Sequence, residues 1–157
     1  MGKALVSEGL LNLNARALNN QAGAVSSAGN LAVNASGGLL GKQVQLVVRD
    51  DNGNPGDAVR AAEELYTREK IDVLTGSFLS HVGMALTDYA GQKKRFFLAS
   101  ETLTDKVVWQ NGNHYTYRLR GSTYMQTAML VKEAVKLKKK RWAIVYPNYE
   151  YGQSAVA

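Results

Sequence analysis

The sequence predicts an α/β fold in which a mainly parallel sheet is flanked by helices. From residue 42 onward, short β-branched and apolar runs alternate with segments whose apolar residues recur at helical spacing. These helical segments are long enough to form the right-handed crossovers that join parallel strands. The length of 157 residues suits one domain with a core of ordinary size.

The first strand is expected at residues 44–48, and the second at residues 71–75. A helix should begin between them, because Asn54 can cap it, Pro55 suits the first helical position and Asp57 places an acid in the first turn. Apolar residues at helical spacing then mark two helix faces. They are Val59, Ala62, Leu65 and Tyr66 in the first helix, and Val82, Ala85, Leu86, Tyr89 and Ala90 in the second.

The alternation continues to the end of the chain. We expect a third strand at residues 95–99, a fourth at 115–119, a helix over about 123–138 and a further strand at 142–146. No run of about 18 apolar residues occurs, so no membrane span is expected.

The net charge of +6 is concentrated in two short runs, residues 93–95 and 136–141. Each run directly precedes an apolar stretch, where a helix should end and a strand should begin. Cations at that place complement the C-terminal end of a helix. We therefore expect solvated helix ends and no nucleic-acid partner.

Several kinds of chemistry are excluded by composition or by spacing. The chain has no cysteine and only two distant histidines, so no disulfide and no metal site are expected. A calcium-like run from Asp50 fails because Pro55 stands where the loop needs glycine. Glycine-rich phosphate loops are absent, and no cofactor is expected. Ser80, His81 and Glu101 contain the groups of a hydrolase, but no nucleophile elbow surrounds the serine, and we predict that the chain is not an enzyme.

Four loops should meet at one edge of the sheet, because the carboxyl ends of parallel strands lie together and ligands bind there. These loops are residues 49–54, 76–80, 100–102 and 147–151. Ser80, at the start of a helix, either caps that helix or helps to hold a carboxylate. Phe78, Tyr149 and Tyr151 are either walls of an apolar pocket or surface aromatics. The loops favour binding of a small zwitterion over chemistry on it.

Five short motifs occur in a characteristic order from residue 37 onward. They are GGLLGK at 37–42, RDD with NP between 49 and 55, GSFLS at 76–80, LTDK at 103–106 and YEYG at 149–152. In this order and spacing the chain resembles the N-terminal lobe of type I periplasmic binding proteins, the branched-chain amino-acid (Leu/Ile/Val) receptors of ABC importers.

The resemblance implies a flavodoxin-like lobe, a small amino-acid-like ligand, an ABC permease as partner and a periplasmic location. It also implies that the ligand's carboxylate and ammonium groups meet Ser80, the stretch of Ala99 and Ser100 with Thr102, and Tyr151. With Phe78 and Tyr149 from the loops, these residues form the predicted ligand-binding set.

The chain also departs from this family. Such receptors have two lobes and about twice this length, so we expect residues 38–157 to form a partial lobe that is impaired in binding. Residues 1–37 are expected to form an atypical segment, since the family's signal peptide, first strand and first helix are replaced there. Without a signal peptide, the chain as written is expected to be cytoplasmic.

Residues of about 10–36 resemble a haemagglutinin-type repeat of secreted adhesins, of which a single copy cannot stack. Alternatively, residues 31–41 end the receptor's first helix. An adhesin-derived interaction module and a hydrolase using Ser80 remain alternative functions. Residues 10–15 could replace the family's missing central strand, and we expect reduced stability if that strand is lost.

Overall fold

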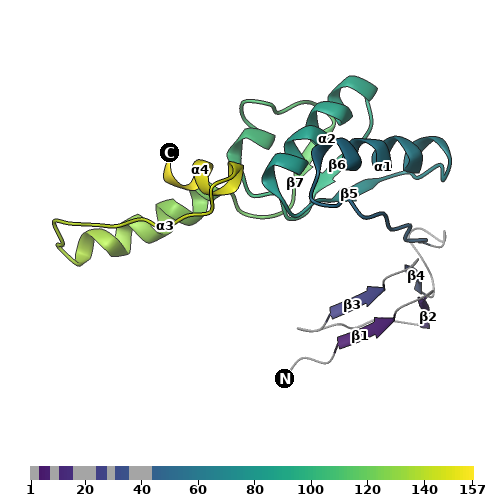
Figure 1. The fold of residues 1–157 in the computed structure, drawn as a ribbon, viewed down its shortest axis with the longest axis horizontal. Coiled ribbons are helices and arrows are strands. Elements are labelled where there is room, and N and C mark those ends of the chain that lie inside the picture. Colours follow the sequence, from purple (N-terminus) through teal and green to yellow (C-terminus); the bar gives the residue numbers. More distant parts are fainter. Residues whose placement is uncertain (1–3, 8–10, 16–23, 28–30, 36–43) are drawn as a thin grey trace. The chain divides into compact units, whose positions relative to one another are not determined.

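The computed structural model describes residues 4–7, 11–15, 24–27, 31–35 and 44–157 (Figure 1). The chain forms two compact units, Met1–Arg49 and Asp50–Ala157, and each is considered by itself.

The second unit contains a parallel sheet of three short strands. These are β5 (Leu74–Gly76), β6 (Phe97–Ala99) and β7 (Thr116–Arg118), in the order β5-β6-β7. In register, Leu74 lies opposite Phe97, and Phe97 lies opposite Thr116. The predicted α/β class with a parallel sheet is therefore confirmed.

The expected helices form. The helices of this unit are α1 (Pro55–Thr67), α2 (Ser80–Lys93), α3 (Thr123–Lys136) and α4 (Glu150–Val156), with a short 3₁₀ turn η1 (Asp105–Val107) after β6. Of these, α2 and α3 each follow a strand of this sheet, β5 and β7 respectively. The predicted start of α1 is confirmed, because the Asn54 side chain accepts hydrogen bonds from the N–H groups of Gly56 and Asp57. The C-cap residue of α2 is Lys94, which adopts a left-handed conformation (φ 54°).

The core lies where α1 and α2 pack against each other and on the sheet (Figure 1). The rings of Tyr66 and Tyr89 stack with centroids 6.4 Å apart, and the Tyr66 hydroxyl donates a hydrogen bond of 2.6 Å to the Phe96 carbonyl. Most residues of the two predicted helix faces are buried. The buried core residues of these elements are Ala58, Ala62, Leu65, Tyr66, Leu74, Val82, Leu86, Tyr89, Ala90, Phe97 and Ala99.

Two predicted strands are wrong. Residues 44–48 and 142–146 form neither helix nor strand, and most of their apolar side chains are exposed, with Val44 at 50% and Val145 at 98% of full exposure. Both runs have strand-like composition, but a strand needs a partner to bond to, and none pairs with them in the described part of the chain. Apolar composition alone does not make a strand.

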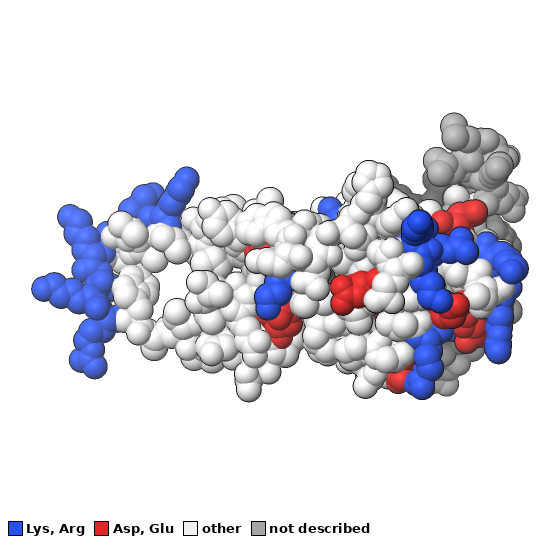
Figure 2. Space-filling view, turned by 90° about the horizontal axis from the view of Figure 1, so that it is seen from above, with Lys and Arg blue, Asp and Glu red and all other residues white. Residues whose placement is uncertain are grey.

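Helix α3 carries a large exposed apolar face. Of its residues, Thr123 is buried, whereas Leu130 and Val135 are each 70% exposed. The segment between α3 and α4 adds Trp142 and Ile144 to this exposed apolar surface. Lys and Arg side chains gather at the far end of α3 (Figure 2), where the basic run 136–141 lies.

The first unit contains two parallel two-stranded sheets. One pairs β1 (Ala4–Ser7) with β3 (Ala24–Ser27), and the other pairs β2 (Leu11–Ala15) with β4 (Leu31–Ala35). The strands β1 and β2 thus form one coil of the chain, and β3 and β4 form a second coil that pairs with the first.

This pairing corrects three expectations. The repeat does stack, because the unit holds two coils rather than one. Residues 11–15 do not replace a central strand, because they pair with β4 and not with the sheet of the second unit. Residues 31–35 form a strand and not the end of a helix. Residues 36–41, the rest of that expected helix end, lie outside the described residues.

Candidate functional site

The candidate site lies at the edge where the three parallel strands of the second unit end, at Gly76, Ala99 and Arg118. The loops that follow are residues 77–79, 100–104 and 119–122. Ligands of open α/β sheets bind at this edge, so its geometry decides what the unit can hold.

The start of α2 faces this edge without a cap. Leu79 is the N-cap residue, and no side chain bonds to the first N–H groups of the helix. Ser80 is therefore the first helical residue rather than the cap. Ser80 is 1% exposed, and its hydroxyl accepts a hydrogen bond of 3.3 Å from the Thr104 N–H. The uncapped N–H groups and the positive end of the helix dipole suit an anion.

The loop after β6 is held against the loop after β5. The Thr102 hydroxyl is fully buried and donates a hydrogen bond of 3.1 Å to the Ser77 carbonyl. The Ser100 N–H donates to the Gly76 carbonyl at 3.0 Å, and the Ala99 carbonyl accepts from the Leu119 N–H at 3.0 Å. The first two bonds fix the loops after β5 and β6 relative to each other, and the third joins the end of β6 to the loop after β7.

Two tyrosines at the start of α4 lie beside the first turn of α2. The Tyr149 ring meets His81 edge to face with centroids 5.7 Å apart, and the centroid of the Tyr151 ring lies 6.1 Å from that of Tyr149. His81 Nε2 lies 3.2 Å from the Gly53 carbonyl, which can only accept, so this nitrogen donates. The tyrosines are half-buried and present aromatic surface next to the uncapped helix.

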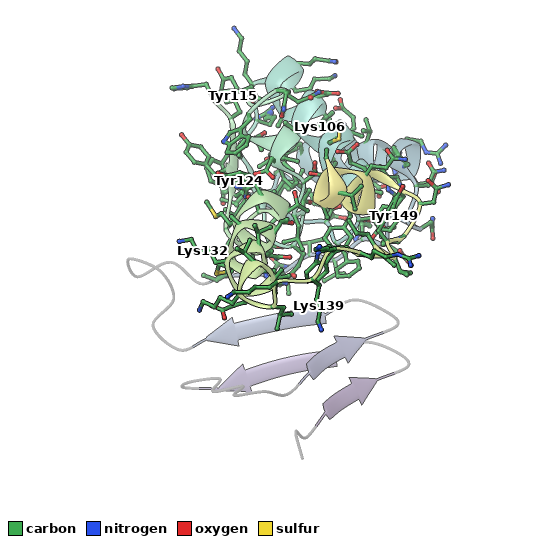
Figure 3. All side chains as sticks on the ribbon, turned by 90° about the vertical axis from the view of Figure 1, so that its left-hand side faces the viewer. Lys106, Tyr115, Tyr124, Lys132, Lys139 and Tyr149 are labelled. Carbon is green, nitrogen blue, oxygen red and sulfur yellow. The ribbon has the colours of Figure 1, made fainter. Side chains whose placement is uncertain are left out.

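Glu150 connects α4 to the loop after β6. Its carboxylate accepts a hydrogen bond of 2.8 Å from the Thr104 hydroxyl and one of 3.0 Å from Lys106 Nζ. Lys106 and Tyr149 are labelled in Figure 3. Thr104 thereby contacts both Ser80 and Glu150, which places α4 against the start of α2.

A buried carboxylate supports the same loop. Asp105 accepts hydrogen bonds of 2.8 Å from the Thr123 hydroxyl and from the Tyr124 N–H, and its other oxygen lies 3.8 Å from Arg118 Nη1. Burial acts to raise the pKa of Asp105. The hydrogen bonds from Ser122, Tyr124 and Thr123, together with the Arg118 charge, outweigh burial and hold that pKa below its usual value.

The structure brings part of the predicted ligand-binding set together. Ser80 and Thr102 are buried in the joined loops, and Tyr149 and Tyr151 lie beside α2, whereas Phe78 is 71% exposed. A ligand role for these residues stays a prediction.

The sequence did not indicate that Thr104, His81 and Glu150 join these elements. The motifs 103–106 and 149–152 contained two of them, but motif order does not reveal which side chains meet.

The hydrolase alternative finds no support in this geometry. The Ser80 hydroxyl bonds to Thr104, His81 bonds to the Gly53 carbonyl, and Glu101 forms an ion pair with Arg120. The three groups of the supposed triad thus have separate partners. Within the described ranges, no cluster of three or more His, Asp or Glu residues could hold a metal ion. No helix of those ranges has the length and apolar character that a bilayer crossing needs.

Comparison with protein families matches residues 22–157 to the family described as periplasmic binding protein. Among curated proteins, an amino acid binding protein of Pseudomonas aeruginosa is 26% identical over 77% of this chain and 32% of its own length. A Leu/Ile/Val-binding protein, BraC3, of Rhizobium johnstonii is 29% identical over 77% of this chain and 33% of its own length. The chain thus spans about a third of the length of these relatives.

Among solved structures, the chain is similar to an amino acid ABC transporter substrate-binding protein from Pseudomonas fluorescens Pf-5. The identity is 25%, the TM-score is 0.63, and the match covers 77% of this chain and 33% of the other. The sequence motifs, the parallel sheet and these matches agree with one another.

Proposed function

Because the chain belongs to the periplasmic binding protein family, we propose that it supplies part of the ligand-binding wall of an ABC importer's substrate-binding component. The family consists of binding proteins and not of enzymes. Branched-chain amino acids or related small amino acids and amides are the proposed ligands, which accords with the names of the two curated relatives. The proposed partner is the ABC permease. The family is periplasmic, and we propose the same location for this chain.

The observation that carries this proposal is the uncapped start of α2 at the carboxyl edge of the sheet. The free N–H groups of its first turn would hold the ligand's carboxylate, as helix N-termini hold anions elsewhere. The neighbouring rings of Tyr149 and Tyr151 would contact the ligand's apolar part. This arrangement suits a small zwitterion with an apolar side chain.

The seven predicted residues would divide into two groups by exposure. Phe78 is exposed and Ser100, Tyr149 and Tyr151 are half-buried, so these four would contact the ligand directly. Ser80, Ala99 and Thr102 are buried, and they would position the loops from behind.

We further propose that this chain alone binds weakly. One wall leaves most of a small ligand in water, whereas binding sites usually enclose 70–90% or more of a ligand's surface. The exposed apolar face of α3 and the span of about a third of the relatives' length accord with a wall that these 157 residues supply only in part.

Isothermal titration of the 157-residue chain with leucine, isoleucine, valine and small amides tests the proposed weakness. We expect no saturable heat at micromolar ligand. Micromolar affinity for any of these ligands would show that the second wall is dispensable.

A complementation experiment tests the binding function itself. The chain is co-expressed with the remaining C-terminal two thirds of the Rhizobium relative, and the purified pair is titrated with leucine. We expect saturable binding that Tyr151→Ala weakens at least about tenfold, because burying a large apolar side chain is worth roughly 1.5–3 kcal/mol. Tyr117→Ala, in β7 rather than in the loops, is the matched control. A folded pair that binds none of the ligands would contradict the function.

A further inference from the structure

The two coils of the first unit repeat each other at a constant offset. Ala4 pairs with Ala24 in one sheet and Leu11 with Leu31 in the other, so both sheets share an offset of 20 residues. One sheet has four register pairs and the other has five, and five of these nine pairs join identical residues. They are Ala4 and Ala24, Ser7 and Ser27, Leu11 and Leu31, Asn14 and Asn34, and Ala15 and Ala35. The chain therefore contains a 20-residue repeat that folds as two stacked coils.

Each sheet of this unit is two strands wide, so each strand pairs on one side only within the described residues. Each coil therefore has an outer edge, one formed by β1 and β2 and the other by β3 and β4. The backbone groups on these outer edges bond to no other strand among the described residues. Proteins usually protect such edges with Lys, Pro or inward-pointing charges. The four strands contain no Lys, Arg, Asp, Glu or Pro. Their sequences do nothing to prevent further pairing.

We propose that the edge of β3 and β4 pairs with the edge of β1 and β2 of a second copy of this chain. Because the coils share one repeat, the second copy would continue, in both sheets at once, the parallel register that already joins the two coils. The contact is head to tail and leaves a free edge at each end, so it adds copies in a row rather than closing a symmetric dimer. This assembly surface goes beyond the proposed transport function and does not depend on it.

Cysteine cross-linking tests the register directly, because the chain has no cysteine of its own. Two full-length variants are made, Asn14→Cys and Asn34→Cys. Position 34 of one copy would lie beside position 14 of the next, about 4.8 Å away and within disulfide reach. Two copies of position 14 would lie about 9.6 Å apart, beyond that reach. Under mild oxidation, the mixture should give at least about tenfold more disulfide-linked dimer than either variant alone.

A mismatched mixture controls for chance collision. Val33→Cys mixed with Asn14→Cys shifts the pairing by one residue, which places the two side chains on opposite faces. We expect this mixture to cross-link no more than the single variants do. Equal cross-linking of matched and mismatched mixtures overturns the proposal.

Sedimentation velocity over a range of concentrations tests the assembly without new cysteines. The natural chain should form species that grow beyond a dimer as concentration rises. Asn12→Lys places a charge on an edge strand and should keep the chain monomeric, whereas Asn20→Lys, between β2 and β3 in sequence, should not. A chain that stays monomeric at every concentration, or one that stops at a discrete dimer, contradicts the head-to-tail edge. If Asn12→Lys still assembles and the mixture of Asn14→Cys with Asn34→Cys does not cross-link, the copies contact each other elsewhere and the proposal is overturned.

Discussion

The Thr104 hydroxyl donates a hydrogen bond of 2.8 Å to the Glu150 carboxylate, which joins residues 46 positions apart in the sequence. Thr104 is fully buried, and its hydroxyl also accepts from the Lys106 N–H at 3.4 Å. This contact holds the start of α4, with its two tyrosines, against the loop after β6. The geometry of the proposed binding wall therefore depends on Thr104.

Thr104→Val should lower the free energy of unfolding by about 1–3 kcal/mol, because it leaves buried polar groups without a partner. Urea unfolding followed by circular dichroism measures the change. Thr67→Val is the matched control, because that hydroxyl is exposed, and we expect a change within about 0.5 kcal/mol. Equal losses in both variants would show that the contact with Glu150 contributes little.

Stability should depend on pH through Asp105. Its pKa in the folded chain lies below the ordinary value of 3.8, so folding favours the charged form. The stabilisation from this carboxylate is therefore present above about pH 4 and is lost as the pH falls through the lower, folded-state pKa. In urea unfolding from pH 7 to pH 2.5, the deficit of Asp105→Asn relative to the natural chain should be largest at neutral pH and shrink in acid. The exposed Asp88→Asn controls for removal of a carboxylate, and a deficit for Asp105→Asn that grows in acid would contradict the assignment.

Gly83 allows close packing of α2 against the loop after β6. A methyl group added there would overlap the Thr102 side chain. Gly83→Ala should cost about 1–3 kcal/mol of stability by overpacking. The double variant with Thr102→Ala should lose less than the sum of the two single losses, as residues in contact are coupled. Gly121→Ala, whose added methyl would meet only Met125 at 3.8 Å, should be nearly neutral. Additive losses at positions 83 and 102 would show that the loop moves away freely.

Thermal unfolding of the whole chain should be weakly cooperative or occur near ambient temperature. The two units fold around separate sets of contacts, the strands of the second unit are three residues long, and α3 exposes its apolar face. Calorimetry, with circular dichroism and tryptophan fluorescence as separate probes, measures the transition. One sharp transition above about 55 °C, within the ordinary mesophile range, would argue against it.

The helices were predictable because their signals are local. Asn54 and Pro55 mark the start of α1 within a few residues, and the buried faces of α1 and α2 follow from apolar spacing. The strands at 44–48 and 142–146 were not predictable in the same way. A strand forms only when another strand pairs with it, and composition does not report the partner.

The 20-residue repeat was missed for a related reason. Spacings of 2 and 3.6 residues describe a single strand or helix, whereas the likeness of Leu11 to Leu31 and of Asn14 to Asn34 appears only at the offset between coils. At the candidate site, the motifs indicated the right loops. They could not indicate that Thr104 lies between Ser80 and Glu150, because these contacts span 24 and 46 residues.

The left-handed Lys94 at the end of α2 makes the helix sensitive to ionic strength. A glycine would adopt this conformation without the steric cost of a Cβ atom. The lysine offsets part of that cost because it places a positive charge at the C-cap, where the helix dipole has its negative end. Salt screens the charge but leaves the backbone cost unchanged. The stability gained by Lys94→Gly should therefore be smallest at low ionic strength and increase as salt is added.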